Sequence, residues 1–418
     1  MQRATEVNCF FACNHQRNII IMKNFVEIAV IGGGVIGTAI TYYLAKAGFD
    51  VCLIERNGIA EGTSGRCDGR VIVYDQVPGE SCRLAKMSLD LFPQLPDELG
   101  FDIGWSQEGT LLLMESEAEY QIAESHCKCM AETGLPYKML DYHQVHSEEP
   151  GLAENVVGGL SVSCDGSVNP MALAQGFEYQ AVKQGATVYS NTNVLDIKSN
   201  RSNTVDHIIT DQGTIRVKKI INAAGSWAGA IGQMVNLSIP IKPRQGQLIV
   251  TERTFPVSGQ PVSEFGYIVT RLEQNDYQRE VTPVMEKYGI AFALEPTNAN
   301  NFLIGTSRCF TGFDLTSNKE LLTAMAKRAI RFYPGLRDIH VIRSYAGLRP
   351  YAPDHLPIIS DTEIEGFYIT AGHEGNGISM APITGELIAN MIGNIPQRID
   401  IDPFRWQRFS SPKEVDNA

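Results

Sequence analysis

Two short apolar runs frame a glycine-rich turn near the start of the chain. Residues 26–30 and 51–54 are mostly apolar and β-branched, as expected of strands that are buried in a parallel sheet. Between them, apolar residues recur at helical spacing from Val35 to Ala47, and Gly48 follows as a stop. The pattern predicts a strand, a turn, a helix and a second parallel strand.

The turn carries the spacing Gly32-x-Gly34-x-x-Gly37. Gly32 permits the tight turn, Gly34 lets the backbone approach a pyrophosphate, and Gly37 lets helix and strand pack closely. The helix begins at Val35 and Ile36, so its free N–H groups and positive end face the diphosphate. Flanked by these strands and this helix, the motif predicts dinucleotide binding.

Glu55 ends the second strand, about 20 residues beyond the first glycine, where an acidic side chain suits the ribose of an unphosphorylated adenosine. Residues 57–75 follow at once and are rich in glycine and small polar residues. This stretch could be a plain surface loop, but its hydroxyls and N–H groups can also meet phosphates or a flavin ring.

The rest of the chain alternates between helical and strand patterns. Ser116 and Ser317 are predicted N-caps, with Glu119 and Glu320 as their capping-box partners. Further predicted helices span residues 81–99, 170–184 and 378–392. Short strands complete a first lobe up to residue 227, and a β-rich second lobe has predicted strands at residues 246–250, 266–269, 290–294 and 302–305.

Composition describes an ordinary globular chain: 418 residues, enough for two domains, with 44% hydrophobic and 20% charged residues. The net charge of −12 argues against nucleic acid or an anionic membrane as the main partner. No segment approaches the roughly 18–20 apolar residues of a membrane span. The nine cysteines show no metal-site spacing, so we expect a cytoplasmic protein with reduced cysteines and no metal.

Residues 1–22 show little periodicity and lack the order of a signal peptide. We expect a loose N-terminal extension, and translation could start at Met22.

Three further segments, taken with the glycine motif, indicate a family: Asn-Ala-Ala-Gly-Ser-Trp at 222–227, Ala-Gly-Leu-Arg-Pro at 346–350, and Gly-His-Glu-Gly-Asn-Gly at 372–377. With them the chain resembles the D-amino-acid-oxidase-like superfamily of FAD enzymes, in its glycine and sarcosine oxidase branch. It looks most like the β subunits of heteromeric dehydrogenases that act on sarcosine, proline, hydroxyproline or opines. The resemblance covers residues 28–392.

The resemblance implies an α/β fold in which an FAD-binding Rossmann-like domain of the glutathione-reductase type is interleaved with a β-rich, mixed-sheet substrate domain. We expect residues 23–100, 155–238 and 340–418 to form the FAD-binding domain. Residues 101–154 and 239–339 would form the substrate domain.

The resemblance also implies a set of residues that line FAD, among which the entry of the last helix would face the N1–C2=O edge of the flavin. A helix N-terminus there would stabilise the negative charge of a reduced flavin. The implied cofactor-binding residues are Gly32, Gly34, Val35, Ile36, Gly37, Glu55, Arg56, Thr63, Ser64, Arg66, Val194, Gly225, Gly347, Arg349, Gly375, Asn376, Gly377 and Ile378.

Arg349 matches the arginine that holds the substrate carboxylate in glycine oxidase, and guanidinium is the natural partner of that planar anion. The alternative is a surface or interdomain ion pair. His373 and Tyr351 flank the same segments and are candidate catalytic residues, although His373 equally suits a structural role. Tyr267 and Arg271 are weaker candidates.

The activity implied is oxidation of a C–N bond in a small amino acid or N-substituted amino acid by hydride transfer to flavin N5, giving an imine that hydrolyses. The chain would be the catalytic subunit of a heteromeric dehydrogenase, with partner subunits carrying the electron-transfer chain. The alternatives are a stand-alone oxidase that produces hydrogen peroxide, and a non-catalytic subunit that only holds FAD.

The chain departs from its relatives at two points. It has Glu374-Gly375 where glycine oxidase has a second arginine, which favours a substrate other than glycine. No cysteine follows Cys309, so FAD is expected to be non-covalent, and the resemblance leaves room for an FMN at a subunit interface.

Overall fold

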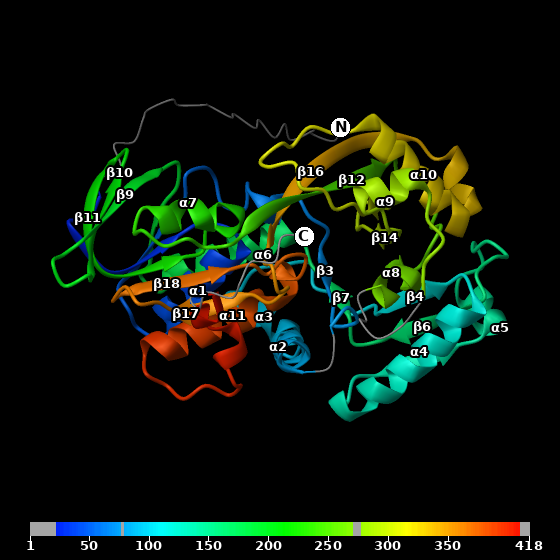
Figure 1. Ribbon diagram of the computed structural model, residues 1–418, viewed down its shortest axis with the longest axis horizontal. Coiled ribbons are helices and arrows are strands. Elements are labelled where there is room, and N and C mark those ends of the chain that lie inside the picture. The colour runs from blue at the N-terminus through cyan, green and yellow to red at the C-terminus, as the bar shows by residue number, and fades with distance from the viewer. Residues whose placement is uncertain (1–21, 77–78, 271–276, 410–418) are drawn as a thin grey trace, which may run out of the picture.

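The computed structural model describes residues 22–76, 79–270 and 277–409. The expected N-terminal extension up to residue 21 and Arg271 lie outside these ranges. Two eight-stranded sheets form the described part of the molecule, one at each end of the long axis in Figure 1. No helix in the described ranges has the length and apolarity that crossing a membrane requires.

The first sheet has the order β17-β18-β11-β1-β2-β8, with the β9–β10 pair attached to β11. From β18 to β8 all neighbours are parallel, which confirms the predicted βαβ unit. Its strands are β1 (Phe25–Ile31), β2 (Val51–Ile54), β8 (Thr187–Tyr189), β9 (Val194–Ser199), β10 (Val205–Thr210), β11 (Gly213–Asn222), β17 (Ile358–Asp361) and β18 (Phe367–Ala371).

The second sheet has the order β16-β12-β15-β14-β13-β4-β6-β5 and is mixed, because β13 and β4 are parallel while the other neighbours are antiparallel. A small separate ladder joins β3 (Arg70–Val71) to β7 (Gly166–Ser167). The strands of the second sheet are β4 (Thr110–Met114), β5 (Tyr137–Leu140), β6 (Gly158–Val162), β12 (Lys242–Thr251), β13 (Val262–Glu264), β14 (Ala293–Pro296), β15 (Phe302–Gly305) and β16 (Val341–Tyr351).

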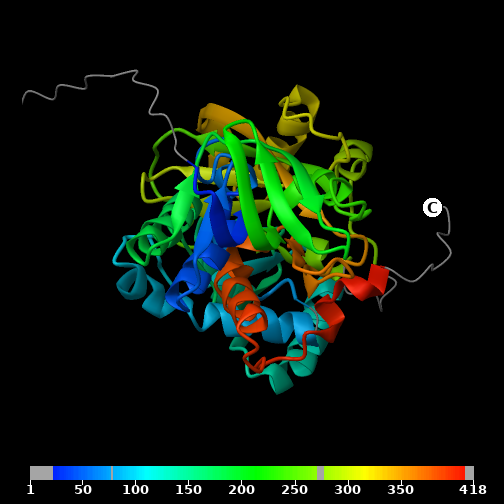
Figure 2. The same ribbon diagram turned by 90° about the vertical axis from the view of Figure 1, so that its left-hand side faces the viewer.

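Helix α1 packs against both α6 and α11 in the cofactor half, which Figure 2 views face on, with α1 in blue and α11 in orange-red. The helices are α1 (Val35–Lys46), α2 (Glu80–Leu89), α3 (Leu95–Leu99), α4 (Glu117–Met130), α5 (Tyr142–Glu148), α6 (Pro170–Lys183), α7 (Ala228–Gln233), α8 (Phe265–Val269), α9 (Pro283–Tyr288), α10 (Lys319–Phe332) and α11 (Gly377–Ile392). The short 3-10 turns are η1 (Thr63–Gly65), η2 (Phe92–Gln94), η3 (Ala131–Thr133), η4 (Gly225–Trp227), η5 (Pro334–Asp338), η6 (Asp402–Phe404) and η7 (Trp406–Phe409).

β6 and β16 pair within the second sheet, while residues 155–238 and 340–418, which contain these strands, are predicted to belong to the FAD-binding domain. The domain bounds stay a prediction. β16 pairs with β12 along its whole length (Figure 1). Both halves of the molecule therefore meet at β16.

Three predicted elements differ from the structure. The helix expected over 81–99 is interrupted at η2, because Pro93 and Pro96 lack the N–H groups that a continuous helix needs. The apolar run 266–269 forms helix α8 instead of a strand, an ambiguity that periodicity alone cannot resolve in so short a run. Asn318, not Ser317, caps α10 by accepting the Leu321 N–H.

Ser116 caps α4 as predicted, by accepting the Glu119 N–H at 3.2 Å. The Glu119 side chain does not complete the capping box. It accepts instead from the Glu115 N–H at 2.8 Å and from the Tyr277 hydroxyl, so it ties the start of α4 to the chain beyond α8.

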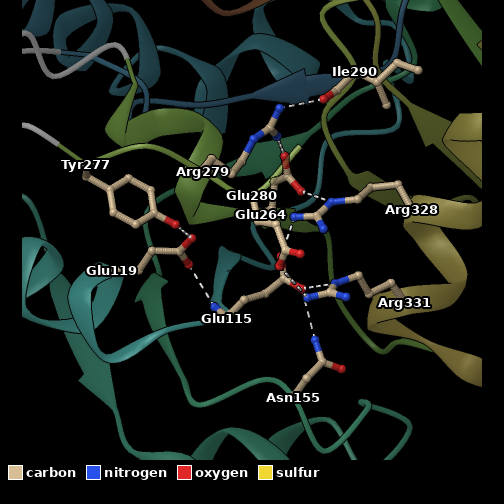
Figure 3. Close-up of polar contacts among 10 residues, drawn as sticks. All are labelled: Glu115, Glu119, Asn155, Glu264, Tyr277, Arg279, Glu280, Ile290, Arg328 and Arg331. Carbon is tan, nitrogen blue, oxygen red and sulfur yellow. Dashed lines mark hydrogen bonds and ion pairs between the residues drawn. The ribbon is translucent and has the colours of Figure 1, made fainter. Parts of the chain in front are cut away.

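A buried network of charges joins α10 to the second sheet (Figure 3). The Arg328 side chain, 5% exposed, donates from Nε to Glu264 Oε2 at 2.6 Å and pairs through Nη2 with Glu115. Arg279 binds the other oxygen of Glu264 and donates to the Ile290 carbonyl at 2.8 Å. Arg328 thus shares its positive charge between Glu264 and Glu115. Each of these carboxylates would lower the stability of the fold if it were left without a cationic partner.

We predict that Arg328→Met lowers the free energy of unfolding by about 3 kcal/mol or more, because Glu264 and Glu115 each lose a buried partner. Urea unfolding of the cofactor-loaded protein measures this. Arg331→Met is the matched control, since Arg331 pairs with the same Glu115 but is 47% exposed, and it should cost about 1 kcal/mol or less. Equal losses in the two variants would contradict the assigned role of Arg328.

Candidate functional site

A cavity of about 360 Å³ lies between the two sheets and takes its walls from both. Of the residues predicted from sequence, Gly37 and Tyr351 are absent from its lining. The predicted residues that line it are Gly32, Gly34, Val35, Ile36, Glu55, Arg56, Thr63, Ser64, Arg66, Val194, Gly225, Tyr267, Gly347, Arg349, His373, Gly375, Asn376, Gly377 and Ile378.

The turn at the start of α1 is shaped for close backbone approach. Gly32 has a φ of +113°, and a Cβ there would lie 2.5 Å from the Ala223 carbonyl oxygen. A Cβ on Gly37 would lie 1.8 Å from the Gly32 carbonyl oxygen, so Gly37 packs helix against strand behind the cavity. The Val35 N–H donates to Ser64 Oγ at 3.0 Å. This cradle fits a diphosphate, because helix N–H groups and glycine backbone face the cavity.

Glu55 stands at the end of β2 with its carboxylate held by backbone. Its Oε2 accepts the Gly33 N–H at 2.6 Å and its Oε1 accepts the Asn57 N–H at 2.8 Å. Each oxygen keeps a further lone pair, so the fixed carboxylate can also accept ribose hydroxyls. The Arg56 guanidinium lies over the Trp227 ring at 4.1 Å and forms the adjoining wall.

One carbonyl fastens the cofactor half to the second sheet. The Leu348 oxygen on β16 accepts the Thr63 hydroxyl at 2.6 Å and the Ser226 hydroxyl at 2.8 Å. The next strand residue back, Gly347, lies so close to η1 that a Cβ would be 2.5 Å from the Arg66 carbonyl oxygen. These contacts fix the part of β16 that presents Arg349 to the cavity.

Arg349 is partly buried and is oriented by two hydrogen bonds. Its Nη1 donates to the Ser307 carbonyl at 2.9 Å, and its Nη2 donates to Thr306 Oγ1 at 2.7 Å. A Cβ on Gly246 of β12 would come within 2.1 Å of Nη1, so glycine makes room for the guanidinium. Burial, and then the charge of Arg308, lower the pKa of Arg349 to about 10, which leaves it protonated at neutral pH.

His373 is 4% exposed, and its Nε2 lies 3.1 Å from the Thr384 hydroxyl on α11. Burial lowers the pKa of His373 to about 3, so the imidazole is neutral at physiological pH and is a weak base. This environment favours the structural alternative for His373, which ties β18 to the last helix.

Tyr351 lies behind the cavity wall. Its ring packs edge-on against Phe310, with ring centroids 5.0 Å apart. The Arg244 guanidinium lies over the same ring, 4.7 Å from its centroid. Arg244 in turn pairs with Glu374 at 2.6 Å between Nη2 and Oε2. The charge of Glu374, which lies in the segment where the sequence comparison with glycine oxidase places a second arginine, is therefore neutralised by Arg244 in the cavity wall.

The last helix begins at the cavity, where Gly375, Asn376, Gly377 and Ile378 line it. The Asn376 amide donates to Asp75 Oδ2 at 3.2 Å, which joins the helix entry to the segment after β3. The first N–H groups of a helix have no partner within it, so this end of α11 suits the electron-rich edge of a flavin.

Sequence reasoning missed Arg308 and undervalued Tyr267, which both line the cavity. Arg308 lies shortly beyond β15, after Thr306 and Ser307, in a stretch without a motif. An arginine within a few residues of the end of an apolar strand was the available signal. In the described ranges, no three His, Cys, Asp or Glu side chains are grouped as a metal site would require.

Comparison with known proteins places the chain in a family. Residues 27–391 match the family model described as FAD dependent oxidoreductase. Glycine oxidase of Geobacillus kaustophilus is 29% identical over 93% of this chain and 98% of its own, and a hydrogen cyanide synthase subunit of Pseudomonas protegens is 28% identical over the same shares. The structure of L-proline dehydrogenase from P. horikoshii superposes with a TM-score of 0.82 at 26% identity, covering 93% of this chain and 99% of that one.

The family model covers the glycine turn at residues 32–37, the part of β16 around Leu348 and Arg349, and the start of α11. The chain has the mixed α/β fold of these relatives. The expected fold class and the expected FAD cofactor are thereby confirmed. The chain belongs to the family of FAD-dependent oxidoreductases that includes glycine oxidase.

Proposed function

We propose that this chain oxidises the C–N bond of a small amino acid or N-substituted amino acid whose carboxylate binds Arg349. The observation that carries this proposal is the Arg349 guanidinium, which faces the cavity and forms no ion pair with a carboxylate among the described residues. The relatives of this chain support the substrate class, since glycine oxidase and L-proline dehydrogenase are named for amino acids.

The side chains around the cavity would bind and orient the substrate. Arg349 fixes the carboxylate, and its hydrogen bonds to Thr306 and Ser307 hold the guanidinium plane in place. FAD, when bound, supplies the chemistry by accepting a hydride from the carbon beside the nitrogen. The nitrogen gives up a proton to become an imine, and the imine hydrolyses in water.

The electron acceptor defines two versions of this function. We propose a catalytic subunit that passes electrons to partner subunits, which is supported by the relative named as a subunit of hydrogen cyanide synthase. The alternative is a stand-alone oxidase, which the likeness to glycine oxidase supports. Re-oxidation of the substrate-reduced protein separates the two: rapid recovery in air with hydrogen peroxide indicates an oxidase, and recovery only with an artificial acceptor indicates a dehydrogenase.

Anaerobic bleaching of the flavin absorption band tests the function itself. The panel is glycine, sarcosine, D- and L-proline, hydroxyprolines and opines. We expect at least one compound to bleach the protein. A yellow protein that no member bleaches, alone or with co-purified partners, contradicts the proposed substrate class.

We predict that Arg349→Met lowers kcat/KM for the reducing substrate by about 100-fold or more while FAD stays bound, because truncating a buried charged partner costs about 2–5 kcal/mol. Stopped-flow flavin reduction measures this, and the visible spectrum checks FAD content. Arg343→Met is the control, since Arg343 lies on the exposed part of β16. An unchanged rate of flavin reduction in Arg349→Met would contradict the proposal that Arg349 binds the substrate carboxylate.

We predict that Gly37→Val yields protein without FAD, because a Cβ there would lie 1.8 Å from the Gly32 carbonyl oxygen and would displace the turn. The ratio of flavin to protein absorbance measures this. Gly335→Val is the control in the exposed turn η5, where nothing lies within 4 Å of a Cβ and the backbone is outside the left-handed region. Full FAD content in Gly37→Val would contradict the cradle.

We predict that His373→Asn leaves the shape of the pH profile of flavin reduction unchanged between pH 6 and about 9. The pKa of His373 is about 3, so the imidazole stays neutral and sheds no proton in this range. Single-turnover reduction at each pH measures the profile. Loss of an inflection near neutral pH in the variant would make His373 a catalytic base after all.

A further inference from the structure

Arg308 is a second cation in the same cavity wall. Its guanidinium lies over the Tyr267 ring at 4.1 Å, and both residues line the cavity. Its Nη1 is buried and has no hydrogen-bond partner, and Arg308 forms no ion pair with any residue of the described ranges. A buried charged donor without a partner is costly, and a ligand anion would relieve that cost.

The neighbouring charges leave Arg308 uncompensated. Arg244 is paired with Glu374, and Glu264 is paired with Arg279 and Arg328 (Figure 3). Burial and then the charge of Arg308 lower the pKa of Arg349, while the charge of Asp68, which also lines the cavity, raises it without forming an ion pair with either arginine among the described residues. Two unpaired guanidinium groups therefore face one cavity, and each favours an anion beside it.

The two guanidinium groups occupy different places along the wall. Thr306 and Arg308 both line the cavity and stand two residues apart, with Ser307 turned inward between them. Arg349 is held at Thr306, by a hydrogen bond of 2.7 Å, whereas Arg308 is held at Tyr267 on α8. Each guanidinium therefore has an anchor of its own, so each can bind a different carboxylate of one ligand.

We propose that the substrate carries a second carboxylate, which Arg308 binds while Arg349 binds the first. The substrate class is then an amino acid whose nitrogen or side chain bears another acidic group. This inference rests on the proposed function for its meaning, but the binding it requires can be measured without turnover.

Two pairs of probes test the proposal. Iminodiacetate differs from sarcosine only by a carboxylate on the N-methyl carbon. Oxydiacetate and methoxyacetate are the corresponding ethers, which lack the C–N bond and report binding alone through the flavin spectrum. We expect the wild-type protein to favour the dicarboxylate in each pair, and Arg308→Gln to lower that preference by about 10-fold or more.

Arg343→Gln is the matched control, because Arg343 also lies over a tyrosine ring but is outside the cavity lining. It should keep the preference of the wild-type protein. Flavin content and circular dichroism establish that each variant is folded, and Arg308→Lys, which keeps the charge, should retain part of the preference.

Three results would overturn the proposal. Equal losses for the mono- and dicarboxylate ethers in Arg308→Gln would mean that both arginines bind one carboxylate. No preference for the dicarboxylate ether in the wild-type protein, or a preference that survives Arg308→Gln, would remove the second site. Dicarboxylate binding without flavin reduction by any amine would leave this site standing and contradict the proposed function instead.

Discussion

The Leu348 carbonyl oxygen is the contact on which the geometry of this site depends. It accepts one hydroxyl from η1, which follows β2, and another from η4, which follows β11. Both turns lie at the carboxyl ends of parallel strands, where ligands of such sheets bind. A strand of the second sheet is thereby fastened to the cofactor half, and its next residue, Arg349, is set in the cavity wall.

Much of the cofactor half could be predicted from sequence because its signals are local. The βαβ unit follows from apolar runs and the spacing of Gly32, Gly34 and Gly37, and β2 ends where the pattern places it. The second sheet was less predictable, because a short apolar run such as 266–269 fits strand and helix equally. The sheet to which β6 and β16 belong was also hard to predict, since their pairing is decided by distant partners.

The substrate end of the site escaped sequence reasoning for a related reason. Arg349 sits in a motif, whereas Arg308 lies in a stretch whose importance arises only when α8, β15 and β16 come together. The reverse holds for Tyr351: its place beside the motif suggested a catalytic role, but its ring packs against Arg244, the partner of Glu374 in the cavity wall. Adjacency in sequence did not determine which side chains face the cavity.

The unpaired positive charge also bears on how an amine could react here without a strong base. His373 is neutral, and the hydrogen bonds of Arg349 to the described residues go to the Thr306 hydroxyl and the Ser307 carbonyl, neither of which is a strong base. Two guanidinium groups near the substrate nitrogen would disfavour its ammonium form and so lower its pKa. The same field that holds carboxylates would therefore favour the neutral amine, the form from which a hydride can leave. Binding and activation would then share one electrostatic cause.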